Sequence, residues 1–162
     1  MSYYRGTAVT EAIRDRLKLI TLDNGYRTNI GRNVHVGKPH GTPTDVPCLF
    51  LLPTRELEAK QYGVAHRERT YAITGFARAR ETVISGHGAG FADEWIVIDA
   101  IIADVCEALE AGAAFSDALI EHLAYDGAEP AYGEDGGDVT GVELNYAVRF
   151  SIAKGDPDNP AT

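Results

Sequence analysis

The sequence predicts an α+β fold, in which two main helices pack on one face of a mostly antiparallel sheet of four or more strands. Two segments carry apolar residues at three- and four-residue steps, as amphipathic helices do, and four others read as strands. Their order is helix, two strands, helix, two strands. Because each strand pair can be joined by a loop without a crossover, this order favours an antiparallel sheet.

The first helix is predicted from Thr7 to Leu22. Its apolar positions fall on one side of a helix and are Val9, Ala12, Ile13, Leu17 and Ile20. Asn24-Gly25 follows, and glycine readily takes the left-handed conformation that ends many helices. We therefore expect the helix to stop there.

Two neighbouring strands are predicted next. Asn33–Val36 reads as an ordered loop or a weak edge strand. The continuous apolar run Val46–Leu52 is too short for a helix and predicts a strand covered on both faces. Glu56–Gly63 is polar and turn-prone, and His66–Arg80 alternates as a half-buried strand does. We expect the alternating strand at His66–Arg80 to pair with Val46–Leu52.

The second helix, Asp93–Glu110, is the strongest element. Its predicted apolar stripe contains Trp95, Ile98, Ile101 or Ile102, Val105, Cys106 and Leu109, and Gly112 stops it.

Two further strands follow the second helix. They are predicted at Leu119–Tyr125 and Val139–Lys154, separated by an exposed acidic loop at Gly127–Gly137. Residues 1–154 then form a single domain, and residues 155–162 form a flexible tail.

Composition narrows the class of protein. The chain has 162 residues, 44% of them apolar, and this length suits one core. A formal charge of −9 argues against general affinity for nucleic acid. The chain has no apolar run of about 18 residues, and its N-terminus is polar, so we expect a soluble, unexported protein with no membrane partner. Cys48 and Cys106 are expected as buried free thiols in a reducing compartment, in preference to a disulfide or a ligand pair.

Charge is unevenly distributed along the chain. Acidic residues gather between Asp93 and Asp138, and basic residues gather in two earlier segments. The basic residues are Arg14, Arg16, Lys18, Arg27, Arg32 and Lys38 in the first segment, and Arg67, Arg69, Arg78 and Arg80 in the second. This distribution fits either ordinary solvated faces or head-to-tail contact between copies of the chain.

The glycine-rich segment SGHGAGFADEW, residues 85–95, is a candidate phosphate loop. A dinucleotide fingerprint requires G-x-G-x-x-G, but Phe91 stands where the third glycine belongs, and the P-loop G-K-[ST] is absent. Asp93 and Glu94 would repel phosphate from the first turn of the helix. A connection that uses glycine for mobility or for close approach to another subunit is the favoured interpretation.

No motif predicts a catalytic, metal or cofactor site. The five histidines show no i,i+4 pair and no cysteine partner, and the acids after Gly127 miss the spacing of a calcium loop. No acid, base and nucleophile stand in a defensible arrangement. We therefore expect a protein that is not an enzyme and uses no cofactor.

Five segments together resemble the tail terminator (tail completion) proteins of long-tailed bacteriophages. They are TAVTEAIRDRLKLI, VPCLFLLP, TYAITGFARA, DEWIVIDAIIADVCEALE and VTGVELNYAVRFSI. The resemblance spans most of the chain and rests on the order and pattern of elements, without an invariant motif.

The resemblance implies a structural virion protein, located in the tail or neck and assembled in the host cytoplasm. It implies a ring of six identical subunits that caps the tail tube and joins it to the head connector, with genomic DNA passing through the lumen without specific binding. The alternatives are a neck adaptor between head and tail, and, less favoured, a small-ligand-binding enzyme that uses the glycine-rich loop.

Candidate contact residues follow from charge and position. The loops Gly37–Thr44 and Glu81–Gly90 are candidates for subunit or tube contacts, with ordinary solvated loops as the alternative. The individual candidates are Arg67, Arg69, Arg78, Arg80, His87, Glu134, Asp135 and Asp138.

Overall fold

The computed structural model describes residues 4–40, 43–61, 64–78, 93–112, 114–115, 119–131 and 139–153. Within these ranges the chain forms two α-helices, two short 3₁₀ turns and a five-stranded sheet of order β1-β2-β3-β5-β4. The elements are α1 (Arg5–Leu17), η1 (Leu22–Asn24), η2 (Ile30–Arg32), β1 (Val34–Val36), β2 (Cys48–Gln61), β3 (Val64–Arg78), α2 (Glu94–Glu110), β4 (His122–Ala131) and β5 (Val139–Ala153).

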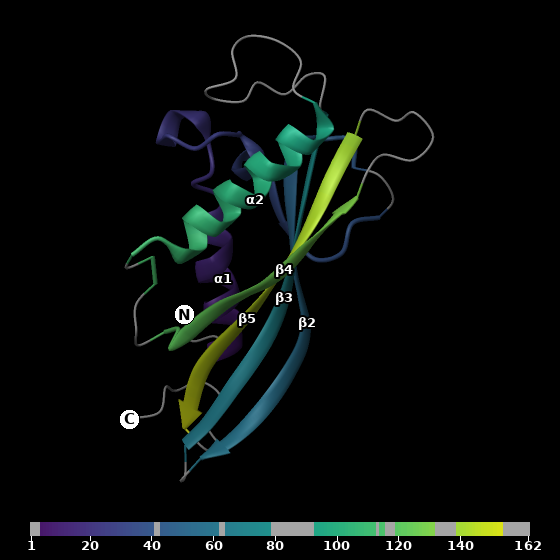
Figure 1. Cartoon of the computed structure of the whole chain (residues 1–162). Helices are drawn as coiled ribbons and strands as arrows, with labels where there is room; N and C mark the ends of the chain where they lie inside the picture. Colours follow the sequence, from purple (N-terminus) through teal and green to yellow (C-terminus); the bar gives the residue numbers. More distant parts are fainter. Residues whose placement is uncertain are drawn as a thin grey trace.

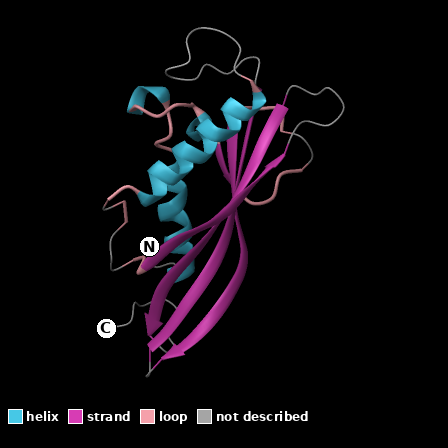
Figure 2. Ribbon diagram, in the orientation of Figure 1, coloured by secondary structure: helices cyan, strands magenta, loops and turns pink. Residues whose placement is uncertain are grey.

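The predicted α+β fold is confirmed. Only the β1–β2 pair is parallel, and the other three strand pairs are antiparallel. Both helices lie on the same side of the sheet (Figures 1 and 2). The sequence allowed either an ordered loop or a weak edge strand at Asn33–Val36. The structure has a short edge strand there, Val34–Val36, beside Leu49–Leu51.

Helix α1 buries Val9, Ile13 and Leu17 but ends at Leu17, so the predicted end near Asn24 is wrong. After Leu17 the backbone turns tightly, and Ile20 N donates to Leu17 O. This turn lets the Ile20 carbonyl accept the Gly31 N–H at 2.9 Å, and a side chain at Gly31 would collide with the Leu17 carbonyl. Gly25, at φ 87°, closes η1 instead of the helix.

The β2–β3 hairpin is longer than predicted, because Glu56–Gln61 belongs to β2 and not to a turn. Glu56 lies directly opposite Arg69. Polar residues can therefore continue a strand, since cross-strand pairs of opposite charge stabilise it. Pro53 is accommodated at a register irregularity between Pro53 and Arg55. Figure 1 shows the end of this hairpin reaching beyond both helices.

Strand β4 also extends further than predicted. It begins at His122 and continues to Ala131, so residues 127–131 of the predicted acidic loop are strand, while residues 132–138 lie outside the described part. Gly127, at φ 109°, sits at a register irregularity between Tyr125 and Ala128. The glycine marks a bulge instead of a turn. Strand β5 matches its prediction to within one residue.

Helix α2 packs on the sheet through Val97, Ile101 and Val105, which are fully buried. Trp95 was expected in this stripe, but its side chain is 58% exposed. The buried face also contains Ala100 and Asp104, so it is centred on a different side of the helix from Trp95. At the contact, Gly75 of β3 leaves room for Ile101, because a Cβ there would lie 2.9 Å from Ile101 Cγ2.

Asp104 anchors the segment after α1 to α2. This carboxylate is completely buried and accepts four hydrogen bonds, from Arg27 N at 3.0 Å, Arg27 Nη1 at 3.1 Å, Thr28 N at 2.8 Å and Thr28 Oγ1 at 2.8 Å. Hydrogen bonds to Glu107 and Asp104 raise the pKa of Arg27. A buried carboxylate is tolerated when its oxygens are satisfied in this way.

The substitution Asp104→Asn should destabilise the fold. An amide keeps the size of the side chain but removes the charge and turns an N–H₂ group toward buried donors. We expect the free energy of unfolding to fall by about 2–4 kcal/mol, measured by urea denaturation. Asp99→Asn, on the exposed face of the same helix, is the matched control and should change stability little. Equal losses in both variants would contradict the anchoring role.

Candidate subunit interface

The eight residues predicted to make subunit or tube contacts divide into two groups. Arg67, Arg69 and Arg78 lie on β3. The others lie outside the described residues, as does the predicted loop Glu81–Gly90; these five residues are Arg80, His87, Glu134, Asp135 and Asp138. The structure brings Arg67 and Arg69 together, whereas Arg78 lies at the opposite end of the strand, paired in register with Val139.

Arg67 and Arg69 share one carboxylate. Arg69 Nη2 lies 2.9 Å from Glu56 Oε2, and Arg67 Nη1 lies 3.3 Å from Glu56 Oε1. Burial alone would raise the pKa of Glu56, but the contacts with Arg69, followed by those with Arg67, outweigh it and lower the pKa. The cluster is thus a cross-strand ion-pair network within the hairpin.

Arg69 also links the hairpin to α1. Its guanidinium donates to Gly6 O at 3.0 Å and lies 5.7 Å from the centre of the Phe150 ring. Its side chain is only 18% exposed, and a Cβ at Gly6 would collide with it. Beside it, Thr10 Oγ1 lies 2.8 Å from the buried Tyr71 hydroxyl. Arg69 therefore holds the fold together, and Arg67, at 34% exposed, is the more accessible of the two.

The sheet has an open face, defined as the side turned away from α1 and α2. Strand alternation places Phe50, Leu52, Ala72 and Phe76 on this face. The Phe50 ring stacks on His35 at a centroid distance of 5.0 Å and meets Phe76 edge-on at 6.0 Å. The expected covering on both faces holds only in part, because Phe50 and Leu52 remain partly exposed.

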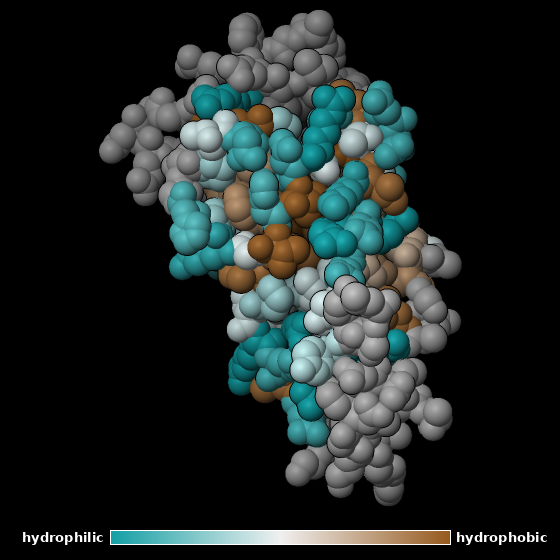
Figure 3. Space-filling model, turned by 180° about the vertical axis from the view of Figure 1, so that it is seen from behind, coloured by the Kyte–Doolittle hydropathy of each residue, from teal (hydrophilic) through white to brown (hydrophobic). Residues whose placement is uncertain are grey.

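Several large apolar side chains are exposed in the described part of the chain. They are Tyr4, Leu19, Val36, Leu57, Trp95 and Tyr125. Figure 3 shows the molecule from behind, with apolar residues at the surface surrounded by hydrophilic ones. Single exposed apolar residues are common on protein surfaces. Leu57 and Tyr125, however, lie on β2 and β4, the two long strands nearest the margins of the described sheet.

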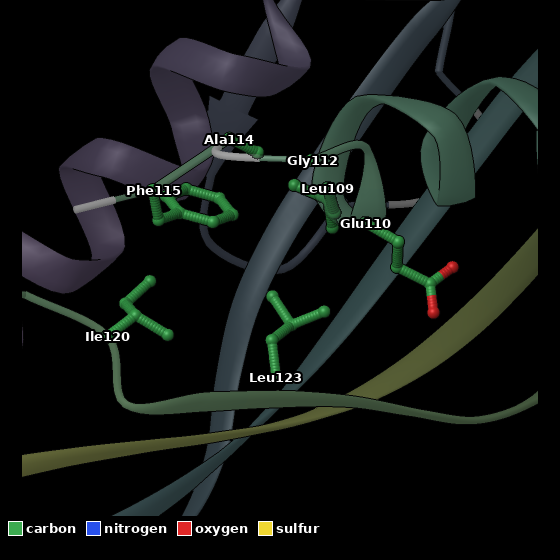
Figure 4. Close-up of a pocket in the computed structure, with 7 residues that line it drawn as sticks. All are labelled: Leu109, Glu110, Gly112, Ala114, Phe115, Ile120 and Leu123. Carbon is green, nitrogen blue, oxygen red and sulfur yellow. The ribbon is translucent and has the colours of Figure 1, made fainter. Parts of the chain in front are cut away.

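A pocket of about 350 Å³ lies where α2 ends, between the helix and β4. Its lining residues are Leu109, Glu110, Gly112, Ala114, Phe115, Ile120 and Leu123. Figure 4 shows the Glu110 carboxylate extending away from the apolar side chains. The pocket therefore offers an apolar surface with one carboxylate, and a base and a nucleophile do not meet among its described lining residues.

Both cysteines are free thiols, as predicted, but only Cys48 is buried as expected, because Cys106 remains partly exposed. Burial raises the pKa of Cys48 to about 11. Burial also raises the pKa of Cys106, whose Sγ accepts a hydrogen bond from the Tyr146 hydroxyl at 3.1 Å. Both thiols therefore stay protonated near neutral pH, which is the less reactive form.

Potential metal ligands are scattered over the described ranges. No group of three or more His, Cys, Asp or Glu side chains is placed to hold a metal ion there. The described helices include none that is long and apolar enough to span a membrane. The glycine-rich segment falls outside the described residues up to Ala92, and α2 begins with Glu94 in its first turn.

Comparison with known proteins finds similarity among solved structures. No protein-family model matches the chain, and no curated protein matches it significantly. Among solved structures, the chain is similar to a chain of the structure described as "Virion of native gene transfer agent (GTA) particle". The TM-score is 0.61 at 19% identity, and the match covers 88% of this chain and 94% of that chain. At this identity the match shows a shared fold.

Removing the Glu56 charge should weaken the fold in a pH-dependent way. Because the folded-state pKa of Glu56 is lowered, its ionised form stabilises the protein above the ordinary pKa of about 4.3, and this contribution is lost as pH falls through the lowered value. Glu56→Gln should therefore cost about 1–2 kcal/mol at pH 7 and progressively less toward pH 3, by urea denaturation. Glu58→Gln, on the exposed neighbouring acid, should cost less at pH 7. A loss for Glu56→Gln that is independent of pH would refute the ion-pair explanation.

Proposed function

We propose that the chain is a structural virion protein, a tail terminator that forms a ring, caps the tail tube and joins it to the head connector. The observation that carries this proposal is the fold shared with a chain of a gene transfer agent virion. Because the match covers most of both chains, it concerns the whole domain and not a common fragment. The sequence patterns that resemble tail terminators support the same role.

The proposed ring contains about six copies of the chain. Rotationally related copies meet through two different surfaces, so each copy must present two complementary patches. The basic residues of the early half and the acidic residues of the later half supply opposite charges for such contacts. The partners are the tail tube protein on one side of the ring and the head connector on the other.

The charge of the chain suits a channel through which DNA passes. A formal charge of −9 repels the phosphate backbone, so genomic DNA can move through the lumen without specific binding. The protein would be assembled in the host cytoplasm and remain in the virion, in the tail or neck. We propose no catalytic step and no cofactor for this role.

Purified protein, alone or with isolated tail tubes, should form rings of about six copies. Light scattering gives the mass, and electron microscopy gives the shape. If arginine–carboxylate contacts join the copies, assembly should weaken between low and high salt, because salt screens exposed charges. A protein that stays monomeric and also leaves tail tubes uncapped would argue strongly against the proposal.

Particles made without this chain should carry overlong or ragged tails. A terminator stops growth of the tube, so its loss leaves length uncontrolled. Electron microscopy of particles from cells lacking the chain measures this, and restoring the intact chain is the control. Heads that leak DNA while tails keep normal length would instead identify a neck adaptor beneath the portal.

A further inference from the structure

Among the described strands, the sheet has two long edges without a partner strand. Strand β1 pairs only with Leu49–Leu51, so among the described residues the outer edge of β2 from Pro53 to Gln61 has no partner strand. The outer edge of β4 is likewise unpaired in the described part. Figure 1 shows the lower half of β2 at the margin of the sheet. An unpaired edge presents backbone N–H and C=O groups that can pair with another chain.

The two edges run in directions that suit each other. β2, β3, β5 and β4 are neighbours in that order, and each neighbouring pair is antiparallel. It follows that β4 runs opposite to β2. When copies are related by rotation about a ring axis, β4 of one copy meets β2 of the next in antiparallel orientation, which allows regular pairing.

Charge on the open face makes this meeting specific. Glu129 lies directly opposite Glu143 on β5, and both are exposed. Like charges in this position destabilise a sheet. Arg55 is exposed at the β2 edge, and its register partner Thr70 places it on the same open face. In the described part of the chain no hydrogen bond or ion pair engages the Arg55 side chain. The β2 edge thus carries a cationic side chain without a counter-charge among the described residues. The β4 edge carries a carboxylate that lies beside a second carboxylate on β5.

We propose that β4 of one copy pairs with the free edge of β2 in a second copy, and that Arg55 of the second copy lies beside Glu129 and Glu143 of the first. This inference rests on the proposed ring and specifies the joint, which is the contact between neighbouring subunits. In this register the free stretch of β2 from Arg55 to Gln61 lies opposite Leu123–Glu129, a stretch of the same length. The proposed pairing also requires the sheets of neighbouring copies to be offset along the strands, as the closure of tilted strands into a ring demands.

Two prolines bound the proposed joint at the same end. Pro53 precedes the free stretch of β2, and Pro130 follows Glu129. In an antiparallel pairing of Arg55 with Glu129, these two residues come close together. Proline has no N–H to donate, so the ladder stops there. The pairing is thereby prevented from extending past this end of the joint.

Charge reversal tests the joint directly. Arg55→Glu and Glu129→Arg should each raise the concentration needed for ring assembly by about tenfold or more, because each places like charges together. The double variant Arg55→Glu with Glu129→Arg should restore assembly. Light scattering and electron microscopy follow the rings, and circular dichroism verifies folding. Lys18→Glu, at the exposed residue that caps α1, and Asp99→Arg, on the exposed face of α2, change net charge by the same amounts and should leave assembly unchanged.

A disulfide variant tests the same joint without relying on charge. Arg55→Cys with Glu129→Cys places the two thiols at opposite edges of one sheet, at least about 14 Å apart across three strand spacings. They are also displaced along the strands, because Arg55 is level with Ala124 and not with Glu129, so they lie too far apart to bond within a copy. Under oxidation, cross-links between copies should give a ladder on a non-reducing gel, whereas either single variant should not. Each single variant retains Cys48 and Cys106, so it shows whether these native thiols form cross-links without the engineered pair.

The outcomes separate this inference from the proposed function. Rings that form equally well in the single charge reversals, with no ladder from the cysteine pair, would overturn the edge joint and leave the terminator role standing. A wild-type chain that remains monomeric on tail tubes would overturn both. Loss of assembly in the single variants with recovery in the double variant supports the joint.

Discussion

Tyr71 and Tyr146 lie directly opposite each other on β3 and β5, and both are buried on the side of the sheet that the helices cover. One-sided burial is the constraint on which the rest of the structure depends. Alternate residues of the central strands, such as Ile73 and Leu144, must be apolar because they face α1 and α2. The intervening residues are free of that demand. The open face and the sheet edges are therefore where polar and charged side chains have room to vary.

Period-two alternation explains which strands could be predicted. Val142–Phe150 and the residues around Ile73 alternate clearly because one face is buried, so β3 and β5 were found nearly to their ends. The same reasoning fails where the β2–β3 hairpin extends beyond the helices. In Glu56–Gln61 only Leu57 and Ala59 are apolar, and the helix-side Glu56 pairs with arginines instead of packing in the core. Its polarity resembles that of a loop, and only knowledge of the partner strand distinguishes the two.

The candidate contact residues show a similar limit. The basic cluster on β3 could be located from the sequence, but the commitment of Arg69 to Gly6 and Glu56 could not, because Gly6 is remote in sequence and carries no side chain. The anchoring role of Asp104 was missed for the same reason. Asp104 lies in an apolar stripe, and its donors at Arg27 and Thr28 come from a polar segment more than 70 residues earlier in the chain. A buried acid within such a stripe is the available signal, since it requires a polar partner.

The sheet sorts its charged residues by face. On the helix side, Glu56, Arg67 and Arg69 are joined within one copy, and their interactions stabilise the fold. On the open side, Arg149 pairs with Glu68, but Arg55 and the Glu129–Glu143 pair stand at opposite edges, too far apart to neutralise each other within one copy. Charges satisfied internally hold the subunit together whether or not it assembles. In the proposed ring, charges left at the edges would be paired when a second copy arrives, so the fold could form first and the assembly follow.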